Sequence, residues 1–416
     1  MRTPLGVFVF ICILLILDFY FFQAVKTVSQ TLQAKYRSVL YILYWGITAL
    51  VIIGFLVFVY TDHEFLGKKF RTYLFATIMG LFFAKLVGMV FFLVDDLRRG
   101  IQWLAGKLFF NHTEVASMPD QGISRSVFLS WLGIAAGSLL FGGLTYGFGN
   151  KYNYKVRKIK LRFPNLPSSF LGIKIVHISD IHSGSFLDHH AVQSGVQMIM
   201  DQKPDLIFFT GDLVNDKASE MDGFMSTFAQ LKAPMGVYST LGNHDYGDYV
   251  KWPQGNLTQE QNLQQVMDVH AKLGWRLLMN ENVILEKDGE KIAILGVENW
   301  SAKNRFPKHG KMNLAYENTE NIPFKILLSH DPSHWDAEVR PDYPDIDLML
   351  SGHTHGMQFG VEIPGFKWSP AQYMYKQWAG LYEEGSQKLY VNRGFGFIGY
   401  PGRVGVLPEI TVIEFE

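Results

Sequence analysis

Four long apolar runs dominate the hydrophobic pattern of the first third of the chain, at residues 4–24, 38–60, 72–94 and 126–148. Each is close to the roughly 20 residues that a helix needs to cross a bilayer. Buried helices of a soluble domain are rarely so long and so uniformly apolar. The pattern therefore predicts a transmembrane region of about four helices over residues 1–150.

The first run also has the basic start of a secretory signal peptide, at Arg2. Its apolar part is longer than the apolar part of such peptides, and no small-x-small cleavage site follows it. We therefore expect a retained span rather than a cleaved leader.

Two charged residues, Asp18 and Lys85, lie inside the first and third runs. An unpaired charge at depth in a bilayer is costly, so one hypothesis is that the two side chains pair within the helical bundle. The alternative is that Asp18 extends to the membrane interface. In the fourth run, Gly133 and Gly137 have the G-x-x-x-G spacing that permits close helix packing.

The basic residues between the runs favour a cytoplasmic N-terminus. In that orientation the inside segments hold Arg2, then Lys68, Lys69 and Arg71, and then the basic cluster of residues 151–162. The outside loops hold Lys26, Lys35, Arg37, Arg98, Arg99, Lys107 and Arg125. Four spans return the chain to the starting side, so we expect the part after residue 150 to be cytoplasmic.

A different pattern covers residues 151–416, where short apolar runs alternate with clusters of Gly, Asp, Asn and His. Residues 151–163 alternate partly between polar and apolar and stop at Pro164, which predicts a first strand with one basic face. That face is either solvated or in contact with anionic lipid headgroups. Later apolar runs suit buried strands, and residues 190–200 and 257–273 have helical patterns. The second domain is therefore expected to be a mixed α/β sandwich over residues 151–416.

Five apolar runs end on residues of metal-ligand type. The endings are Asp180-Ile181-His182, Gly211-Asp212, Gly242-Asn243-His244-Asp245, Ser329-His330-Asp331 and Gly352-His353-Thr354-His355-Gly356. A pair of divalent cations needs a bridging carboxylate and several further ligands. Imidazole, carboxylate and amide oxygen together suit manganese, iron or zinc rather than a structural thiolate site. Five such endings in order predict a two-metal phosphoesterase with its ligands at one edge of the sheets.

Composition narrows the class of partner. The formal net charge of zero argues against a dedicated nucleic-acid-binding surface. The single cysteine, Cys12, lies in the first apolar run and cannot form a disulfide within one chain. We therefore expect a phosphorylated small-molecule or lipid-linked substrate, and membrane lipids as partners.

The ordered endings resemble the calcineurin-like metallophosphoesterase superfamily over residues of about 155–416. The closing segments 389–396 and 408–410 are similar to its membrane-linked bacterial phosphodiesterase branch. The resemblance implies a four-layer α/β/β/α sandwich and a bacterial inner-membrane location. It further implies a hydrolase that cleaves a phosphoester or diphosphate bond through a metal-bridging hydroxide.

The resemblance also implies a role for each residue that matches the family's motifs. Asp180, His182 and His355 are expected to hold the first ion, and Asn243, His330 and His353 the second. Asp212 is expected to bridge the two ions. His244 matches the family's non-ligand histidine, which stabilises the phosphoryl group or protonates the leaving oxygen.

One position departs from a common family pattern. Related phosphatases have an aspartate three residues after the bridging one, where it can orient the catalytic histidine, but this chain has Asn215 there. Asp216 or Asp245 could replace it, or His244 needs only a neutral partner.

Two further segments bear on the substrate. Residues 300–319 carry Lys303, Arg305, Lys308, His309 and Lys311, either as a basic lip over a phosphate or as a solvated loop. Residues 359–382 are rich in aromatics, which either cover acyl chains and lie against the membrane or pack beside the site. Arg393 either reaches the phosphate or braces the site.

The favoured function is hydrolysis of a lipid-linked or membrane-proximal substrate, with a nucleotide-lipid diphosphate such as UDP-diacylglucosamine as a candidate. The alternative is a membrane sensor or scaffold with a non-catalytic phosphoesterase-like domain. Non-catalytic relatives usually lose a ligand, whereas all seven ligand positions are filled in this chain.

Overall fold

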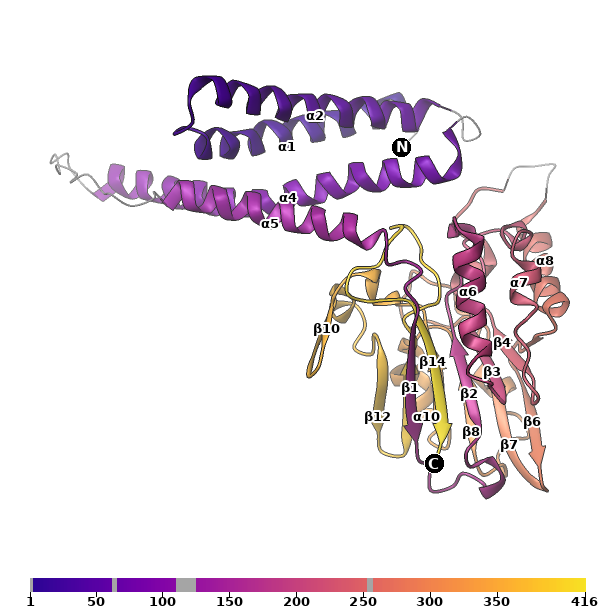
Figure 1. The fold of residues 1–416 in the computed structure, drawn as a ribbon. Coiled ribbons are helices and arrows are strands. Elements are labelled where there is room, and N and C mark those ends of the chain that lie inside the picture. Colours follow the sequence, from indigo (N-terminus) through magenta and orange to yellow (C-terminus); the bar gives the residue numbers. More distant parts are fainter. Residues whose placement is uncertain (1–2, 62–65, 110–124, 253–256) are drawn as a thin grey trace. The chain divides into compact units, whose positions relative to one another are not determined.

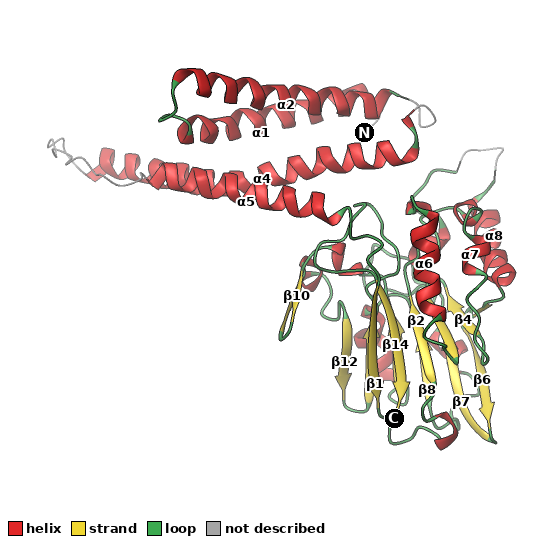
Figure 2. Ribbon diagram, viewed as in Figure 1, coloured by secondary structure: helices red, strands yellow, loops and turns green. Residues whose placement is uncertain are grey.

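The computed structural model describes the whole chain except residues 1–2, 62–65, 110–124 and 253–256. The chain divides into two compact units, Met1–Tyr146 and Gly147–Glu416 (Figure 1). The first unit is helical, and the second holds the strands (Figure 2).

Four helices of the first unit are long and apolar enough to cross a membrane, which confirms the four predicted spans. They are α1 (Pro4–Val28), α2 (Ala34–Tyr60), α4 (Lys68–Phe109) and α5 (Arg125–Gly147). Helix α4 has 42 residues, about twice the length that a bilayer needs. The third apolar run predicts only the first part of α4, because the charged residues from Asp95 onward end the run but not the helix.

A buried ion pair joins α1 to α4. The Lys85 ammonium donates to the Asp18 carboxylate, which also accepts a 2.8 Å hydrogen bond from the Tyr44 hydroxyl of α2. Asp18 is only 2% exposed. The pairing hypothesis is therefore confirmed, and extension of Asp18 to the interface is wrong. Sharing one carboxylate among three helices removes most of the cost of burying it.

Small residues bring α4 and α5 into close contact. A side chain at Gly133 would lie 2.6 Å from the Gly88 carbonyl oxygen, and one at Gly137 would lie 2.6 Å from the Ala84 carbonyl oxygen. The G-x-x-x-G of α5 thus faces an equally spaced Ala84 and Gly88 on α4. This confirms the close packing that the spacing permits.

The second unit contains two six-stranded sheets and a separate hairpin. The first sheet, in spatial order, is β1 (Lys155–Leu161), β14 (Glu409–Phe415), β2 (Lys174–Ile178), β3 (Leu206–Thr210), β4 (Val237–Thr240) and β5 (Arg276–Leu277). The second is β12 (Gly380–Glu384), β13 (Gln387–Val391), β9 (Leu348–Ser351), β8 (Lys325–Leu328), β7 (Glu290–Gly296) and β6 (Glu281–Lys287). The hairpin pairs β10 (Val361–Ile363) with β11 (Phe366–Trp368).

Alternation along the strands builds the layers. In β3, Leu206 and Phe208 join a core shared by the two sheets, whereas Ile207 and Phe209 join a core with the helices. Those helices are α6 (His189–Met200), α7 (Met225–Phe228) and α8 (Gln259–Leu273). A third core joins the other face of the second sheet to α9 (Met312–Tyr316) and the turn Trp335–Val339, which precedes α10 (Arg340–Asp342). The order helix, sheet, sheet, helix is the predicted four-layer α/β/β/α sandwich.

The chemistry-bearing loops follow the carboxyl ends of buried strands. Strands β2, β3 and β4 are parallel neighbours in one sheet, and β8 and β9 are parallel neighbours in the other. Parallel neighbours deliver their carboxyl ends to the same edge of a sheet. This topology gathers five loops from distant parts of the sequence.

Candidate metal centre

The backbone of the gathered loops is strained at the candidate ligands. Of eleven non-glycine residues with positive φ among those described, five are candidate ligands: Asp180 at 53°, His182 at 49°, Asp212 at 61°, His353 at 68° and His355 at 49°. Left-handed backbone at such residues costs about 1 kcal/mol or more each. The surrounding structure therefore holds these side chains in place against a local preference.

Two glycines let the loops approach one another. A Cβ at Gly242 would lie 2.3 Å from Asp212 Oδ1, and one at Gly352 would lie 2.2 Å from Asp180 Oδ2. A larger residue at either position would displace a candidate ligand.

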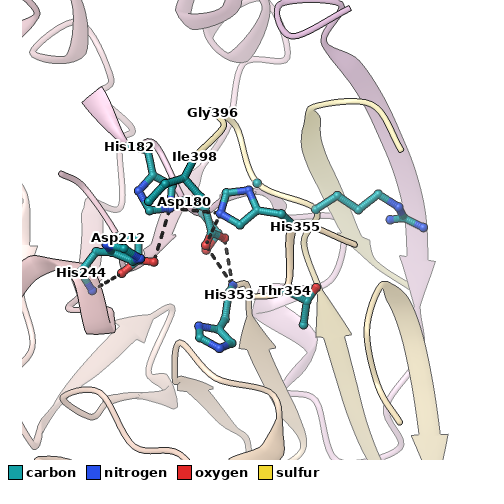
Figure 3. Close-up of polar contacts among 12 residues, drawn as sticks. Asp180, His182, Asp212, His244, His353, Thr354, His355, Gly396 and Ile398 are labelled. Atoms are coloured by element: carbon teal, nitrogen blue, oxygen red, sulfur yellow. Dashed lines mark hydrogen bonds and ion pairs between the residues drawn. The ribbon is translucent and has the colours of Figure 1, made fainter. Parts of the chain in front are cut away.

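Asp180, His182 and His355 form the first buried group, and Figure 3 shows the three side chains pointing toward one another. His355 Nε2 lies 3.0 Å from His182 Nε2 and 3.2 Å from Asp180 Oδ1. The ligand atoms of the group all lie within 4.8 Å of one another, so they could hold one metal ion.

Asp212, His330 and His353 form a second group of the same kind. His330 Nε2 lies 3.2 Å from Asp212 Oδ2 and 3.2 Å from His353 Nδ1. The two groups are adjacent, because the His353 amide donates to both oxygens of Asp180 at 3.0 Å (Figure 3).

One carboxylate oxygen faces both groups. Asp212 Oδ2 lies 3.5 Å from His182 Nε2 of the first group and 3.2 Å from His330 Nε2 of the second. Its other oxygen, Oδ1, accepts a 2.8 Å hydrogen bond from the His244 amide. A single oxygen between two ligand groups is the arrangement that a bridging carboxylate requires.

The side-chain amide of Asn243 indicates that these groups suit a cation. Its Nδ2 donates to the Tyr249 hydroxyl at 2.8 Å, whereas its Oδ1 is buried without a hydrogen-bond donor among the residues that the structure describes. A buried amide oxygen nearly always has a donor or a cation as partner. Asn243 and Asp212 line the same cavity, so the unmatched oxygen belongs to the site.

The pKa shifts of most of these candidate ligands favour the protonation state that binds a metal. Burial lowers the pKa of His353 to about 4 and that of His182 well below its usual value, so both imidazoles are neutral at pH 7. Burial opposes ionisation of Asp212, but the His330 and His244 imidazoles hold the pKa of that carboxyl well below its usual range. Burial likewise opposes a charge on His330, yet the Asp212 carboxylate raises its pKa to about 10. A cation would displace that proton.

His244 lies beside the groups and is oriented by main chain. Its Nδ1 is 2.8 Å from the Asn215 carbonyl oxygen, and because a carbonyl can only accept, Nδ1 carries the proton. The other ring nitrogen, Nε2, is then free to act in the cavity, which His244 lines. The open question of the orienting residue is thereby answered: the partner is neutral, and it is neither Asp216 nor Asp245.

Asp245 instead holds the loop of the shared carboxylate. Its two oxygens accept hydrogen bonds from the amides of Asp212, Leu213 and Gly242 at 2.8–2.9 Å. Such bonds fix the turn after β3 and explain the positive φ of Asp212.

Further partners fix the ring orientation of the candidate ligands, and sequence reasoning did not find them. His330 Nδ1 meets the Thr210 carbonyl oxygen at 2.7 Å, and His353 Nε2 meets the Tyr375 hydroxyl at 2.7 Å. The fully buried Arg403 lies 3.2 Å from His355 Nδ1 and donates to the Arg393 carbonyl oxygen at 2.7 Å. Outer partners of this kind orient metal ligands. Arg403 lies far from any ligand motif and no local signal marks it, whereas Tyr375 belongs to the aromatic segment 359–382, for which packing beside the site is one of the two explanations.

The groups open into a cavity of about 320 Å³. Its walls combine candidate ligands with Arg305, Phe306, Met357, Met374 and Tyr400. Of the predicted basic lip only Arg305 lines it; Lys308 stacks on Trp300, and His309 on Tyr246. The solvated-loop alternative therefore holds for most of residues 300–319.

The structure also bears on the alternatives for Arg393 and for the aromatic segment 359–382. Arg393 pairs with Glu409 and Glu362, at 2.5 and 2.6 Å, so it braces the fold rather than reaching the cavity. In the aromatic segment, Tyr375 and Trp378 are buried beside the site, whereas Phe366 and Tyr373 are exposed. Packing beside the site therefore accounts for Tyr375 and Trp378, and contact with lipid stays a prediction for the exposed side chains.

Comparisons with known proteins agree with this geometry. Residues 173–357 match the family model "Calcineurin-like phosphoesterase", and residues 1–150 match "Probable Calcineurin-like phosphoesterase, transmembrane domain". An uncharacterized metallophosphoesterase of Bacillus subtilis, YkuE, is 31% identical over 71% of this chain and 98% of its own. A transmembrane protein with a metallophosphoesterase domain from Danio rerio is 30% identical over 63% of this chain and 57% of its own. The phosphodiesterase YaeI of Escherichia coli is 28% identical over 58% of this chain and 81% of its own.

Proposed function

This chain belongs to the calcineurin-like metallophosphoesterases that carry an N-terminal four-helix transmembrane domain, and from that premise we propose that it is a membrane-anchored phosphodiesterase with two metal ions. The family makes it a hydrolase of phosphoester bonds that uses divalent metal ions. The observation that carries the proposal is the position of Asp212 Oδ2, within 3.5 Å of an imidazole in each ligand group.

We assign Asp180, His182 and His355 to the first ion, and Asn243, His330 and His353 to the second, with Asp212 bridging both. The unmatched Asn243 Oδ1 supports the second set. Imidazole, carboxylate and amide ligands suit manganese, iron or zinc. Bound in these groups, two such cations supply an activated water and offset the charge of the phosphoryl oxygens.

The chain's own contribution to the chemistry centres on His244. The proton on its Nδ1 is hydrogen-bonded to the Asn215 carbonyl oxygen. His244 can therefore donate to the leaving oxygen only a proton carried on Nε2. Arg305 and Phe306 lie on the cavity wall, where they can bind and orient the substrate. The bond proposed to be cleaved is a phosphoester or a diphosphate bond.

The test is metal-dependent hydrolysis of a soluble phosphodiester, bis(p-nitrophenyl) phosphate, by the full chain in detergent micelles. Hydrolysis should need added manganese, and His244→Ala should lower kcat by about 10² to 10⁴-fold. His190→Ala, which removes an exposed imidazole on α6 outside the motifs, is the control and should retain the wild-type rate. Equal rates in wild type and His244→Ala would refute the assignment of His244.

A lipid-linked diphosphate such as UDP-diacylglucosamine is the proposed substrate class. Four transmembrane helices and the apolar Met357, Met374 and Ile398 of the cavity wall support it. In mixed micelles, kcat/KM for the nucleotide-lipid should exceed that for the same nucleotide diphosphate without acyl chains. Activity confined to soluble phosphoesters would remove the lipid from the proposal and leave the hydrolase.

We also propose a bacterial inner-membrane location with the second unit in the cytoplasm. The basic cluster of residues 151–162 and the basic residues at the start of α4 support this orientation. A fluorescent reporter fused to the C-terminus should fluoresce, because the C-terminus is expected to lie in the cytoplasm. Activity of a C-terminal alkaline phosphatase fusion, which needs export, would place the second unit on the opposite side.

A further inference from the structure

The exposed apolar side chains of the second unit are concentrated in one short stretch. Among its described residues, ten large hydrophobic side chains are exposed, and six of these lie between residues 357 and 374. They are Met357, Val361, Ile363, Phe366, Tyr373 and Met374, with exposed fractions from 37% to 77%. An apolar patch of this kind marks an interaction surface.

The β10–β11 hairpin presents the centre of this patch as one face of a two-stranded ribbon. Val361 pairs with Trp368 and Ile363 pairs with Phe366, and partners in a register lie on the same face. Glu362 and Lys367 pair with each other and so occupy the opposite face. The hairpin is therefore amphipathic, with its apolar face outward.

The polar face is fastened to the domain. Glu362 accepts from Arg393 at 2.6 Å and pairs with Arg157 of β1, while Lys367 donates to the Ala379 carbonyl oxygen at 2.6 Å. Arg393 is in turn fixed by the buried Glu409 at 2.5 Å. These ion pairs hold the ribbon so that its apolar side chains stay outside the core.

The base of the hairpin is bonded to the first residues of the second unit, which follow directly on a transmembrane helix in the chain. The Gly147 carbonyl oxygen, which belongs to the last residue of α5 and the first of the second unit, accepts a 3.0 Å bond from the Arg403 amide. The next residue, Val404, forms a bridge with Phe359 and accepts from the Gly360 amide at 2.8 Å. Val361, which follows Gly360, begins β10. The apolar face thus starts a few residues from the point where the chain leaves a 23-residue apolar span.

We propose that the outward face of the β10–β11 hairpin docks onto the bilayer that α5 crosses, with Val361, Ile363 and Phe366 inserted among the lipids. Tyr373 and Trp368, joined through a 3.4 Å hydrogen bond, lie where aromatic side chains meet the interface. Exposed Lys376 supplies a charge for anionic headgroups. The occupant is lipid, and the surface is independent of any chemistry in the cavity.

The position of the patch gives the docking a consequence for the proposed function. Met357 and Met374 belong both to the patch and to the cavity wall. An apolar path therefore leads from the hairpin to the candidate ligands, along which acyl chains can lie. This consequence rests on the proposed lipid-linked substrate, whereas the docking itself does not.

Because Cys12 is the sole cysteine, the test is a site-specific fluorophore in the full chain. A Cys12→Ser chain with Ile363→Cys carries the label, and Cys12→Ser with Leu171→Cys, at another exposed apolar position, is the matched control. The labelled chains are reconstituted in vesicles of phosphatidylethanolamine and phosphatidylglycerol. Acyl-chain spin labels should quench the label at 363 several-fold more than aqueous iodide does, and the reverse should hold at 171. Quenching at 363 by iodide alone would overturn the proposal, as would quenching by neither, which would mean that protein covers the hairpin.

A second variant separates docking from catalysis. Ile363→Ser combined with Phe366→Ser should keep wild-type hydrolysis of soluble bis(p-nitrophenyl) phosphate but lose about tenfold on a vesicle-embedded lipid substrate. An unchanged rate on the embedded substrate would contradict the docking. Loss of both activities with wild-type metal content would count against it too, because the hairpin would then act on the chemistry itself.

Discussion

Asp18 in the first unit and Asp212 in the second are both carboxylates that are 2% exposed, but their surroundings differ. Asp18 sits inside a regular helix and is matched by one ammonium and one hydroxyl. Asp212 has a φ of 61° and shares its space with a second carboxylate and several imidazoles. The charge of Asp18 is balanced within the chain. Asp212 instead belongs to a set of ligand atoms that converge on two candidate ion positions.

The difference separates a structural charge from a functional one. A single unmatched atom is not enough, because buried His270 also has a ring nitrogen without a partner among the described residues. What marks the second unit is the coincidence of strained backbone, converging ligand atoms and an unmatched oxygen. Substitutions in the two units should therefore fail in different ways.

The largest effect is expected from Asp212→Asn. Loss of the shared negative charge should lower kcat for bis(p-nitrophenyl) phosphate by about 10³-fold, because both ligand groups depend on one oxygen. Asp205→Asn makes the same chemical change just before β3 rather than just after it, and should retain the rate within about twofold. A wild-type rate in Asp212→Asn would contradict the functional role that distinguishes Asp212 from Asp18.

In the membrane unit, breaking the ion pair should affect stability and leave the chemistry unchanged. Lys85→Met, which leaves Asp18 unpaired, should cost about 3 kcal/mol of unfolding free energy. Adding Asp18→Asn should recover most of that loss, since no charge then remains buried. Unfolding in mixed detergent micelles measures this; simple addition of the two losses would contradict the pairing.

A smaller effect concerns pH and His270. Burial lowers the pKa of His270 to about 3, so the folded chain keeps it neutral while the unfolded chain takes up a proton below about pH 6.5. Its contribution to stability is thus present above pH 6.5 and is lost as pH falls toward 3. Between pH 7 and pH 5 the loss should be about 2 kcal/mol. In urea titrations of the full chain, His270→Gln should lack this share of the pH dependence; equal slopes would contradict it.

The smallest effect is expected from Arg403→Lys. The guanidinium contacts the His355 ring and donates to four main-chain carbonyl groups, and a lysine cannot reproduce that set of bonds. Manganese affinity should fall about tenfold, with kcat restored at saturating metal. Titration calorimetry measures the affinity directly, and a kcat that stays low at saturation would show a role beyond orientation.

The sequence predicts the architecture well because its signals are long or repeated. Each transmembrane run is long enough to stand alone, and the strand endings recur five times. The end of α4 was missed because charges such as Asp95 end an apolar run without ending a helix. The short strand β5, of two residues, carries too little pattern to be found.

The sequence also names all residues of the two ligand groups, because each follows an apolar run. It does not find their supporting partners. Main-chain groups such as the Asn215 and Thr210 carbonyls have no side-chain signature, so hydrogen bonds to them cannot be predicted from residue type. Tyr375 and Arg403 reach the site only through tertiary folding.

The most direct test of the two-metal account is the number of metal ions per chain. The full chain should be saturated with manganese, freed of excess metal and measured by elemental mass spectrometry together with its rate. Wild type should hold close to two ions, and Asp212→Asn should hold fewer. Full hydrolysis with at most one ion, or two ions retained in Asp212→Asn, would contradict the shared role of this carboxylate.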